Sequence, residues 1–150
     1  MSAHTANPAG RILALDLGER RIGVAVSDQA RAIAQPLCVI ERTSRDADLA
    51  AIAALAAELG AGLIVLGLPR RDDDDSLGPL GEKALSWGKR LGRATGLAVA
   101  FVDEWETTAQ AQELLIEGGA SRARRRGVVD KLAAALILRR YLDGQGVEPQ

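Results

Sequence analysis

Residues 63–68, LIVLGL, make a continuous apolar run that Pro69 closes. A strand with one face in water alternates apolar and polar side chains, and this run does not alternate. It therefore predicts a strand buried on both faces, as a parallel strand is when helices flank the sheet. The chain is accordingly expected to fold as a layered α/β domain.

Patterns along the rest of the chain predict the elements around this strand. Two apolar segments, 12–17 and 22–27, are separated by a short polar turn and predict a hairpin, and residues 36–41 predict a third strand. Thr43 or Ser44 can cap a helix over 46–59 that Gly60 ends. Four further elements are predicted: a helix over 80–95, a strand over 97–102, a helix that opens with a capping box at 107–110, and an apolar helix over 127–141 buried against the sheet.

The chain of 150 residues is expected to form one domain. That domain spans 11–143, between a flexible tail over 1–10 and a C-terminal tail over 144–150. No signal peptide is predicted, because the first ten residues have no basic flank and no apolar segment. No membrane span is predicted, because no apolar run approaches the roughly 20 residues that a spanning helix needs. Cys38 is the only cysteine and cannot form an internal disulfide, so a cytoplasmic protein is expected.

Histidine is nearly absent, and this excludes whole classes of catalytic site. The only one, His4, lies in the N-terminal tail. Nucleophiles activated by histidine and the usual zinc sites therefore cannot be built. Carboxylates remain as candidates for catalysis. If the protein is an enzyme, its cofactor is expected to be a cation that prefers oxygen ligands, Mg²⁺ or Mn²⁺.

Three acids occupy positions from which they can meet. Asp16 interrupts the apolar run of the first strand, where an unpaired carboxylate is costly to bury. Glu104 follows the strand over 97–102, and Asp130 is expected in the first turn of the final helix. Converging carboxylates repel one another, and bound divalent cations remove that repulsion. The three acids therefore predict a site for two cations that cleaves a phosphodiester.

Asp103 competes with Glu104 for this site. Neighbouring residues of a strand point to opposite faces, so only one of the two can enter it. Glu104 is preferred, and Asp103 is kept as a secondary candidate. Thr107 and Thr108 are secondary candidates as well, although helix capping is the simpler explanation of both.

The acids also have simpler interpretations. An aspartate near a glycine at a strand end is often a turn residue, which is the alternative for Asp16. An aspartate in a first helical turn can simply complement the helix macrodipole, which is the alternative for Asp130. The four aspartates of 72–75 are interpreted as a solvated loop and not as a metal loop.

Basic residues gather next to Asp130, although the net charge of the chain is only -1. They are either an ordinary wet surface or, beside a metal site, the place where a phosphate backbone is held. Four aromatic residues are poor material for base stacking, so recognition of structured nucleic acid by shape and backbone is favoured. The candidates for nucleic-acid binding are Arg20, Arg21, Arg70, Arg71, Arg122, Arg124, Arg125, Arg126 and Lys131.

Four segments, LALDLGERRIGVAVSD, IVLGLP, VDEWETT and GVVDKLAAALIL, resemble the YqgF (RuvX) family of Holliday junction resolvases, also described as nucleases of pre-16S ribosomal RNA. The resemblance runs from about residue 11 to 143. It implies a ribonuclease H-like fold, with a mixed five-stranded sheet whose first three strands are antiparallel. It also implies a nuclease dependent on Mg²⁺ or Mn²⁺, with Asp16, Glu104 and Asp130 matching the family's catalytic acids.

The sequence departs from the family pattern where substrate is expected to lie. Trp105 and Glu106 follow the Asp-Glu pair, and Arg70 and Arg71 follow IVLGLP. These departures leave open whether precursor ribosomal RNA or branched DNA is the substrate, and the sequence does not decide between monomer and homodimer. Two other functions are kept as alternatives: a single-domain phosphate-binding protein related to actin-like ATPases and sugar kinases, and an RNA-binding module without catalysis.

Overall fold

The computed structural model describes residues 10–69, 78–103, 122–144 and 146–147, and for 78–80, 122–127 and 147 it describes the backbone alone. Within this part of the chain, no helix is both long enough and apolar enough to cross a membrane.

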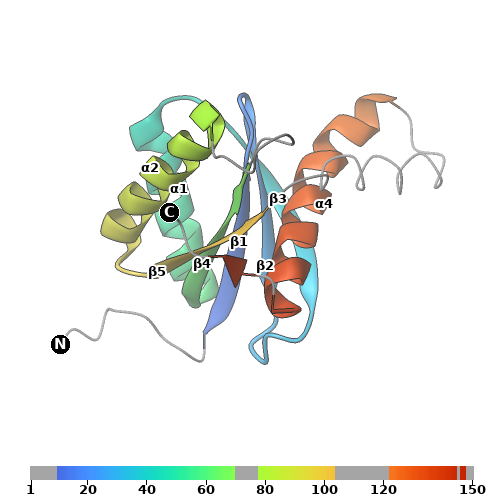
Figure 1. Cartoon of the computed structure of the whole chain (residues 1–150). Coiled ribbons are helices and arrows are strands. Elements are labelled where there is room, and N and C mark those ends of the chain that lie inside the picture. The colour runs from blue at the N-terminus through green and yellow to red at the C-terminus, as the bar shows by residue number, and fades with distance from the viewer. Residues whose placement is uncertain (1–9, 70–77, 104–121, 145, 148–150) are drawn as a thin grey trace.

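A mixed sheet forms the centre of the molecule (Figure 1). Its strands lie in the order β3-β2-β1-β4-β5-β6, so that β1 is central. β1 is antiparallel to β2, and β2 to β3, whereas β4 runs parallel to β1 and β5 parallel to β4. The strands are β1 (Arg11–Leu17), β2 (Arg21–Ser27), β3 (Ala34–Glu41), β4 (Ala61–Leu68), β5 (Ala98–Asp103) and β6 (Gly146–Val147).

The predicted sheet is confirmed, including its three antiparallel first strands. The described residues add the short sixth strand β6, which pairs with β5 inside the segment expected to be a C-terminal tail. The buried character of β4 is confirmed too, because seven of its eight positions are buried and the eighth is partly buried. Helices on both faces of the sheet explain that burial.

Helices α1 (Arg45–Leu59) and α2 (Gly78–Thr95) cover one face of the sheet, and α4 (Arg122–Leu142) covers the other (Figure 1). Of the two predicted caps of α1, Ser44 is the one observed, since its hydroxyl accepts a hydrogen bond from the amide of Ala47 at 3.1 Å. Gly60 ends the helix with φ of 68°, in the left-handed region that glycine adopts at least cost.

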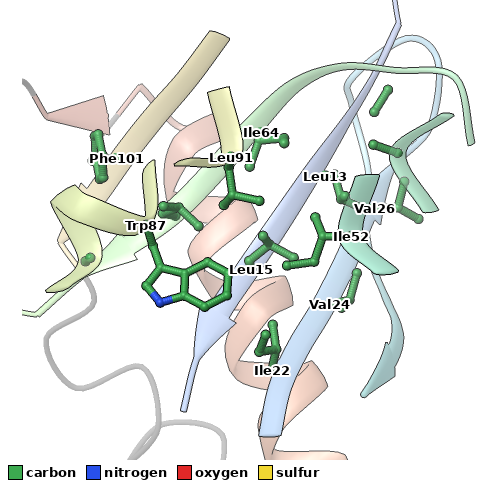
Figure 2. Close-up of a cluster of buried hydrophobic side chains, with 14 of the residues drawn as sticks. Leu13, Leu15, Ile22, Val24, Val26, Ile52, Ile64, Trp87, Leu91 and Phe101 are labelled. Atoms are coloured by element: carbon green, nitrogen blue, oxygen red, sulfur yellow. The ribbon is translucent and has the colours of Figure 1, made fainter. Parts of the chain in front are cut away.

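Two apolar cores lie on the two faces. Under α1 and α2 the sheet presents large side chains, among them Leu13, Leu15 and Ile64, and Trp87 and Leu91 of α2 pack on them (Figure 2). The core under α4 includes much smaller residues. Its buried members are Ile12, Ala14, Ala25, Val65, Val102, Ala134, Ala135, Ile137 and Leu138.

The start of the last helix differs from the prediction. α4 begins at Arg122 and not at Gly127. Arginine is a good helix former, so the basic run 122–126 extends the helix through Gly127 despite a cost of about 1 kcal/mol for that glycine. Asp130 consequently lies in the third turn of α4 and not in the first. The macrodipole, which acts within the first turn, therefore does not account for this acid.

The helix predicted to begin at 107–110 lies outside the described residues, as does the aspartate run 72–75.

Candidate active site

Asp16 is the acid that strand β1 delivers to the face covered by α4. Side chains alternate along a strand, and Ile12 and Ala14 belong to the core under α4, so Asp16 continues the same row. Its exposed fraction is only 8%. The burial expected from the apolar run around this carboxylate is confirmed.

Glycines lie beside Asp16 in both neighbouring strands. Gly23 of β2 is its registered partner. On β4, Leu66 pairs with Leu15, so Gly67 comes next to Asp16 on that side. Because glycine has no side chain, neither neighbouring strand places a side chain next to the carboxylate in this row. Glycine inside a strand often marks a position that a ligand or another backbone approaches closely.

Gly23 also explains how Asp130 reaches this place. A Cβ atom at Gly23 would lie 1.9 Å from the carbonyl oxygen of Asp130 and 3.1 Å from the amide nitrogen of Lys131. Helix α4 therefore crosses β2 backbone against backbone, an approach that a larger residue would block. Asp16 and the backbone of Asp130 share Gly23 as a neighbour, although the two residues come from opposite ends of the chain.

Asp130 is held by an arginine of the neighbouring strand. The Nε atom of Arg21 donates a hydrogen bond to Oδ2 of Asp130 at 2.5 Å, and both side chains are partly exposed. This hydrogen bond, with the charge of Asp130, raises the pKa of Arg21 above its usual value. The sequence predicts that Arg21 contacts nucleic acid, and in the structure it fixes the position of a predicted catalytic acid.

The other predicted site residues fall into three groups. Arg20 is exposed in the turn between β1 and β2, and Lys131 is partly buried on α4. Arg122, Arg124, Arg125 and Arg126 lie on the first turns of α4, where the backbone alone is described. Outside the described residues lie Glu104, Arg70, Arg71, Trp105, Glu106, Thr107 and Thr108.

Asp103 ends β5 on the face opposite Asp16. It pairs with Leu68 of β4, and Phe101, two positions earlier, packs into the core under α1 and α2. Strand alternation therefore places Asp103 on that face. The carbonyl oxygen of Asp103 accepts a hydrogen bond from Nη1 of Arg140 at 2.7 Å, which ties the end of β5 to α4. Among the described residues no group of three or more metal-ligating side chains is present.

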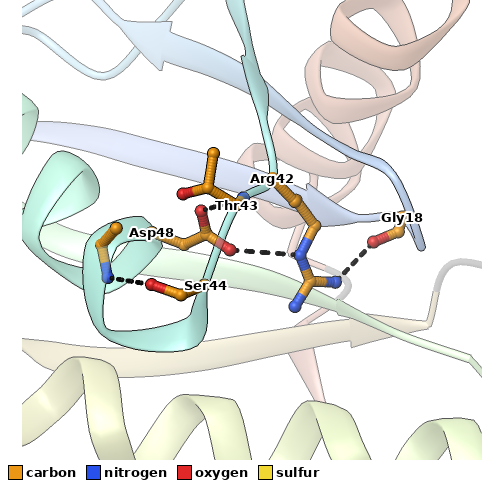
Figure 3. A network of polar contacts seen from close by, with 6 residues as sticks. Gly18, Arg42, Thr43, Ser44 and Asp48 are labelled. Atoms are coloured by element: carbon orange, nitrogen blue, oxygen red, sulfur yellow. Dashed lines mark hydrogen bonds and ion pairs between the residues drawn. The ribbon is translucent and has the colours of Figure 1, made fainter.

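A second polar cluster, which the sequence did not reveal, lies at the same end of the sheet on the other face (Figure 3). Arg42 donates to the carbonyl oxygen of Gly18 at 2.6 Å and to Asp48 at 3.4 Å. The amide of Thr43 also donates to Asp48, at 3.1 Å. The guanidinium of Arg42 lies 5.2 Å from the centre of the Trp87 ring. These contacts join the β1–β2 turn, α1 and α2, so no local pattern could have predicted them.

Comparison with known proteins gives matches over nearly the whole chain. The family model described as "RuvX: Holliday junction resolvase" matches residues 10–144. A protein of Caldanaerobacter subterraneus subsp. tengcongensis named "Putative pre-16S rRNA nuclease" is 43% identical over 136 residues, 90% of this chain and 97% of its own. A protein of Pelotomaculum thermopropionicum with the same name is 47% identical over 137 residues, 91% of this chain and 88% of its own.

Solved structures agree with the fold. RuvC of T. thermophilus in complex with a Holliday junction substrate has a TM-score of 0.58 at 13% identity, covering 92% of this chain and 99% of that one. The fowlpox virus resolvase in complex with Holliday junction DNA has a TM-score of 0.55 at 10% identity, covering 89% and 97%. The ribonuclease H-like fold expected from the sequence is confirmed by these neighbours.

Proposed function

The chain belongs to the RuvX (YqgF) family of Holliday junction resolvases, and we propose that it is a nuclease that hydrolyses phosphodiester bonds of structured nucleic acid. The observation that carries this proposal is the approach of α4 to Gly23, because it puts the backbone of Asp130 against the strand partner of the buried Asp16. The proposed substrates are precursor 16S ribosomal RNA, after the names of the relatives, and Holliday junctions, after the family description. The cytoplasm is the proposed location, in line with a single, unpaired cysteine.

We propose further that the activity depends on Mg²⁺ or Mn²⁺ held by Asp16, Asp130 and Glu104. The two described acids suit such a cation, because both supply carboxylate oxygens on the α4 side of the sheet and the strands beside Asp16 carry glycines at this position. Glu104 is proposed as the third ligand because the residue after Asp103 returns to the α4 face if strand alternation continues. When bound, divalent cations supply an activated water and stabilise the leaving oxygen of the phosphodiester.

The residues of the chain do the positioning. Arg21 orients the carboxylate of Asp130 and supplies a positive charge where two acids come together. Gly23 and Gly67 keep the row around Asp16 free of side chains. The basic first turns of α4, with arginines between eight and four residues before Asp130, supply the charge that holds a phosphate backbone near the acids.

Removal of the Asp16 charge tests the function. Asp16→Asn keeps the size of the side chain and removes the negative charge that a cation requires. We expect the rate of single-turnover cleavage of a four-way DNA junction or of precursor 16S ribosomal RNA to fall by at least about 100-fold. Loss of a residue that only supports a metal ligand already costs up to about 100-fold, and Asp16 is proposed as a ligand itself. Asp46→Asn, an exposed acid of the first turn of α1, is the matched control and should cleave normally.

The metal and the substrate are decided in the same assay, with Mg²⁺, Mn²⁺ or EDTA and with each of the two nucleic acids. Binding of either substrate without cleavage in any metal would favour the RNA-binding alternative over a nuclease. Equal cleavage by Asp16→Asn and Asp46→Asn at equal melting temperature would remove Asp16 from the site. The phosphate-binding alternative related to kinases is disfavoured, because the family match already covers residues 10–144.

The third acid is tested by a pair of neighbouring variants. We expect Glu104→Gln to abolish cleavage and Asp103→Asn to keep most of it, since alternation puts Asp103 on the other face of the sheet. Thermal melts of both variants serve as the control of folding. A folded but inactive Asp103→Asn beside an active Glu104→Gln would reverse the assignment and imply a bulge at the strand end.

A further inference from the structure

A basic pocket lies on the face of the sheet opposite Asp16, between the carboxyl end of β1, the start of α1, and α2. Its volume is about 670 Å³. Four cationic side chains and two acidic ones line it, and its floor includes Trp87. The charged lining residues are Glu19, Arg42, Arg45, Asp48, Lys83 and Arg90.

The charges of this basic pocket do not cancel. Asp48 is only 3% exposed and is already neutralised by its ion pair with Arg42. Arg45, Lys83 and Arg90 remain against the exposed Glu19. An anion that enters the pocket therefore meets an excess of positive charge.

Arg42 is fixed in place before any ligand arrives. Its guanidinium is held by Asp48 and by the carbonyl oxygen of Gly18 (Figure 3). It also lies over the Trp87 ring, 5.2 Å from the centre of the ring. A guanidinium held in this way loses little further conformational entropy when it binds an anion. Arg45, Lys83 and Arg90 supply the uncancelled positive charge for one phosphate group, and Arg42 adds a guanidinium whose position is already set.

The basic pocket and the proposed site of Asp16 lie at the same end of the sheet, next to the carboxyl end of β1. Leu17 and Gly18 line the pocket and follow Asp16 directly in the chain, and Gly67 lines the pocket and lies beside Asp16 in the sheet. Asp16 faces α4, whereas the pocket faces α1 and α2. A strand of nucleic acid that crosses this end of the sheet would thus contact both the basic pocket and the face that carries Asp16.

We propose that the basic pocket binds a backbone phosphate of the substrate strand, away from the phosphodiester that is cut, through Arg45, Lys83 and Arg90 around the fixed Arg42. This inference rests on the proposed nuclease function and adds to it a second anchoring point on the other face of the sheet. A free nucleotide or inorganic phosphate has the same chemistry, so the experiment compares the sources.

The test compares two pairs of substitutions on the same helix. Lys83→Ala with Arg90→Ala removes two cations from the pocket, and Lys89→Ala with Arg93→Ala removes two exposed cations of α2 that do not line it. Binding of a fluorescein-labelled four-way junction and of precursor 16S ribosomal RNA is measured by anisotropy in EDTA, so that cleavage does not intervene. Thermal melts verify that both variants fold.

We expect the pocket pair to raise Kd at least about tenfold, the cost of one charge-assisted hydrogen bond, and the control pair less than about twofold. The slope of log Kobs against log salt should flatten by about 0.9, because one phosphate is no longer neutralised by the protein. Arg45→Glu, on α1, should weaken binding in the same way and provides an independent variant. Equal effects of the pocket and control pairs would overturn the inference.

Titration calorimetry with AMP and with inorganic phosphate shows whether the pocket binds a backbone phosphate of nucleic acid or a free small anion. Tight binding of either by the parent, abolished in the pocket pair while junction and RNA affinities stay unchanged, would overturn the inference in favour of a free small anion.

Cleavage by the parent reports on the proposed function separately. A parent that does not cleave, together with a selective loss of affinity in the pocket pair, would remove the nuclease proposal and keep the pocket. If the parent cleaves and the pocket and control pairs bind the nucleic acids equally well, the nuclease proposal is kept and the pocket proposal is removed.

Discussion

The two faces of the sheet are packed in different ways. Around the centre of β1 and β2, the face under α1 and α2 carries Leu13, Leu15 and Val24. At neighbouring positions the face under α4 carries Ala14 and Ala25, together with Gly23. Large side chains keep α1 and α2 away from the sheet, and a pocket remains at the carboxyl end of β1. The small residues on the other face let the backbone of α4 contact the backbone of β2. The same strands thus border a pocket on one face and lie against the backbone of α4 on the other.

The largest effect is expected where a helix touches the sheet through backbone atoms. In Gly23→Ala the added Cβ overlaps the carbonyl oxygen of Asp130, so α4 must move away from β2. We expect a loss of about 3 kcal/mol of unfolding free energy, the upper end of the cost of overpacking, together with loss of cleavage. Urea denaturation and the junction-cleavage assay measure the two effects.

Gly88→Ala is the matched variant on the other face. Its added Cβ would lie 2.7 Å from Cζ of Phe101, the tip of a side chain and not a backbone atom. The ring can shift, and alanine is the better helix former, so the net change should stay below about 1.5 kcal/mol. Gly92→Ala meets ordinary contacts only and should stabilise α2 by up to about 1 kcal/mol. A Gly23→Ala protein as stable as Gly88→Ala would contradict the close packing of α4.

A smaller effect separates the two buried carboxylates, Asp16 and Asp48. Asp48→Asn replaces an acceptor with an amide beside the donors of Arg42 and Thr43. We expect a loss of about 1.5–3 kcal/mol of unfolding free energy, the value of hydrogen bonds to a charged group, with cleavage chemistry kept under saturating substrate. Asp16→Asn should do the opposite, losing cleavage while keeping stability. Denaturation and single-turnover cleavage of both variants check this contrast, which fails if the two behave alike.

The smallest effect belongs to Asp28, an acid held mostly by backbone amides. The amides of Ile33 and Ala32 donate to its Oδ1 at 3.0 and 2.7 Å, and they lower the pKa of Asp28 below its usual 3.8. A lowered native pKa stabilises the fold above the unfolded value and loses that contribution as the pH falls through the native one. The difference in melting temperature between the parent and Asp28→Asn should therefore be small near pH 7 and shrink further as the pH falls below the usual Asp pKa of 3.8. A difference that persists in acid would contradict the assignment.

The parts of the fold that local patterns determine could be predicted from the sequence. The β1–β2 hairpin and the buried β4 follow from runs of apolar residues, and the ends of α1 follow from Ser44 and Gly60. The burial of Asp16 follows as well, because the residues on either side of it are apolar. Each of these signals lies within a few positions of the element that it sets.

The parts that depend on contacts between distant segments could not be predicted. Glycine is a local helix breaker and so predicts a start of α4 at Gly127, but the packing of a long helix over β1, β2 and β3 outweighs that cost. Gly23 resembles an ordinary strand residue in the sequence, and only the fold places Asp130 against it. The cluster of Arg42 and Asp48 brings a turn, a helix start and Trp87 together, and the sequence alone does not show which arginine finds which acid.

The pairing of Arg21 with Asp130 joins positions 109 residues apart. Chains emerge from the ribosome with the N-terminal end first, at about 5–20 residues per second, so roughly 5–20 s of synthesis separate these two residues. The sheet-forming hairpin can fold early from local contacts, but the acid of α4 is made only after strands β1 to β5. A nascent chain therefore carries the β1–β2 hairpin before α4, and the packing of α4 against Gly23 can form only after the hairpin has been made.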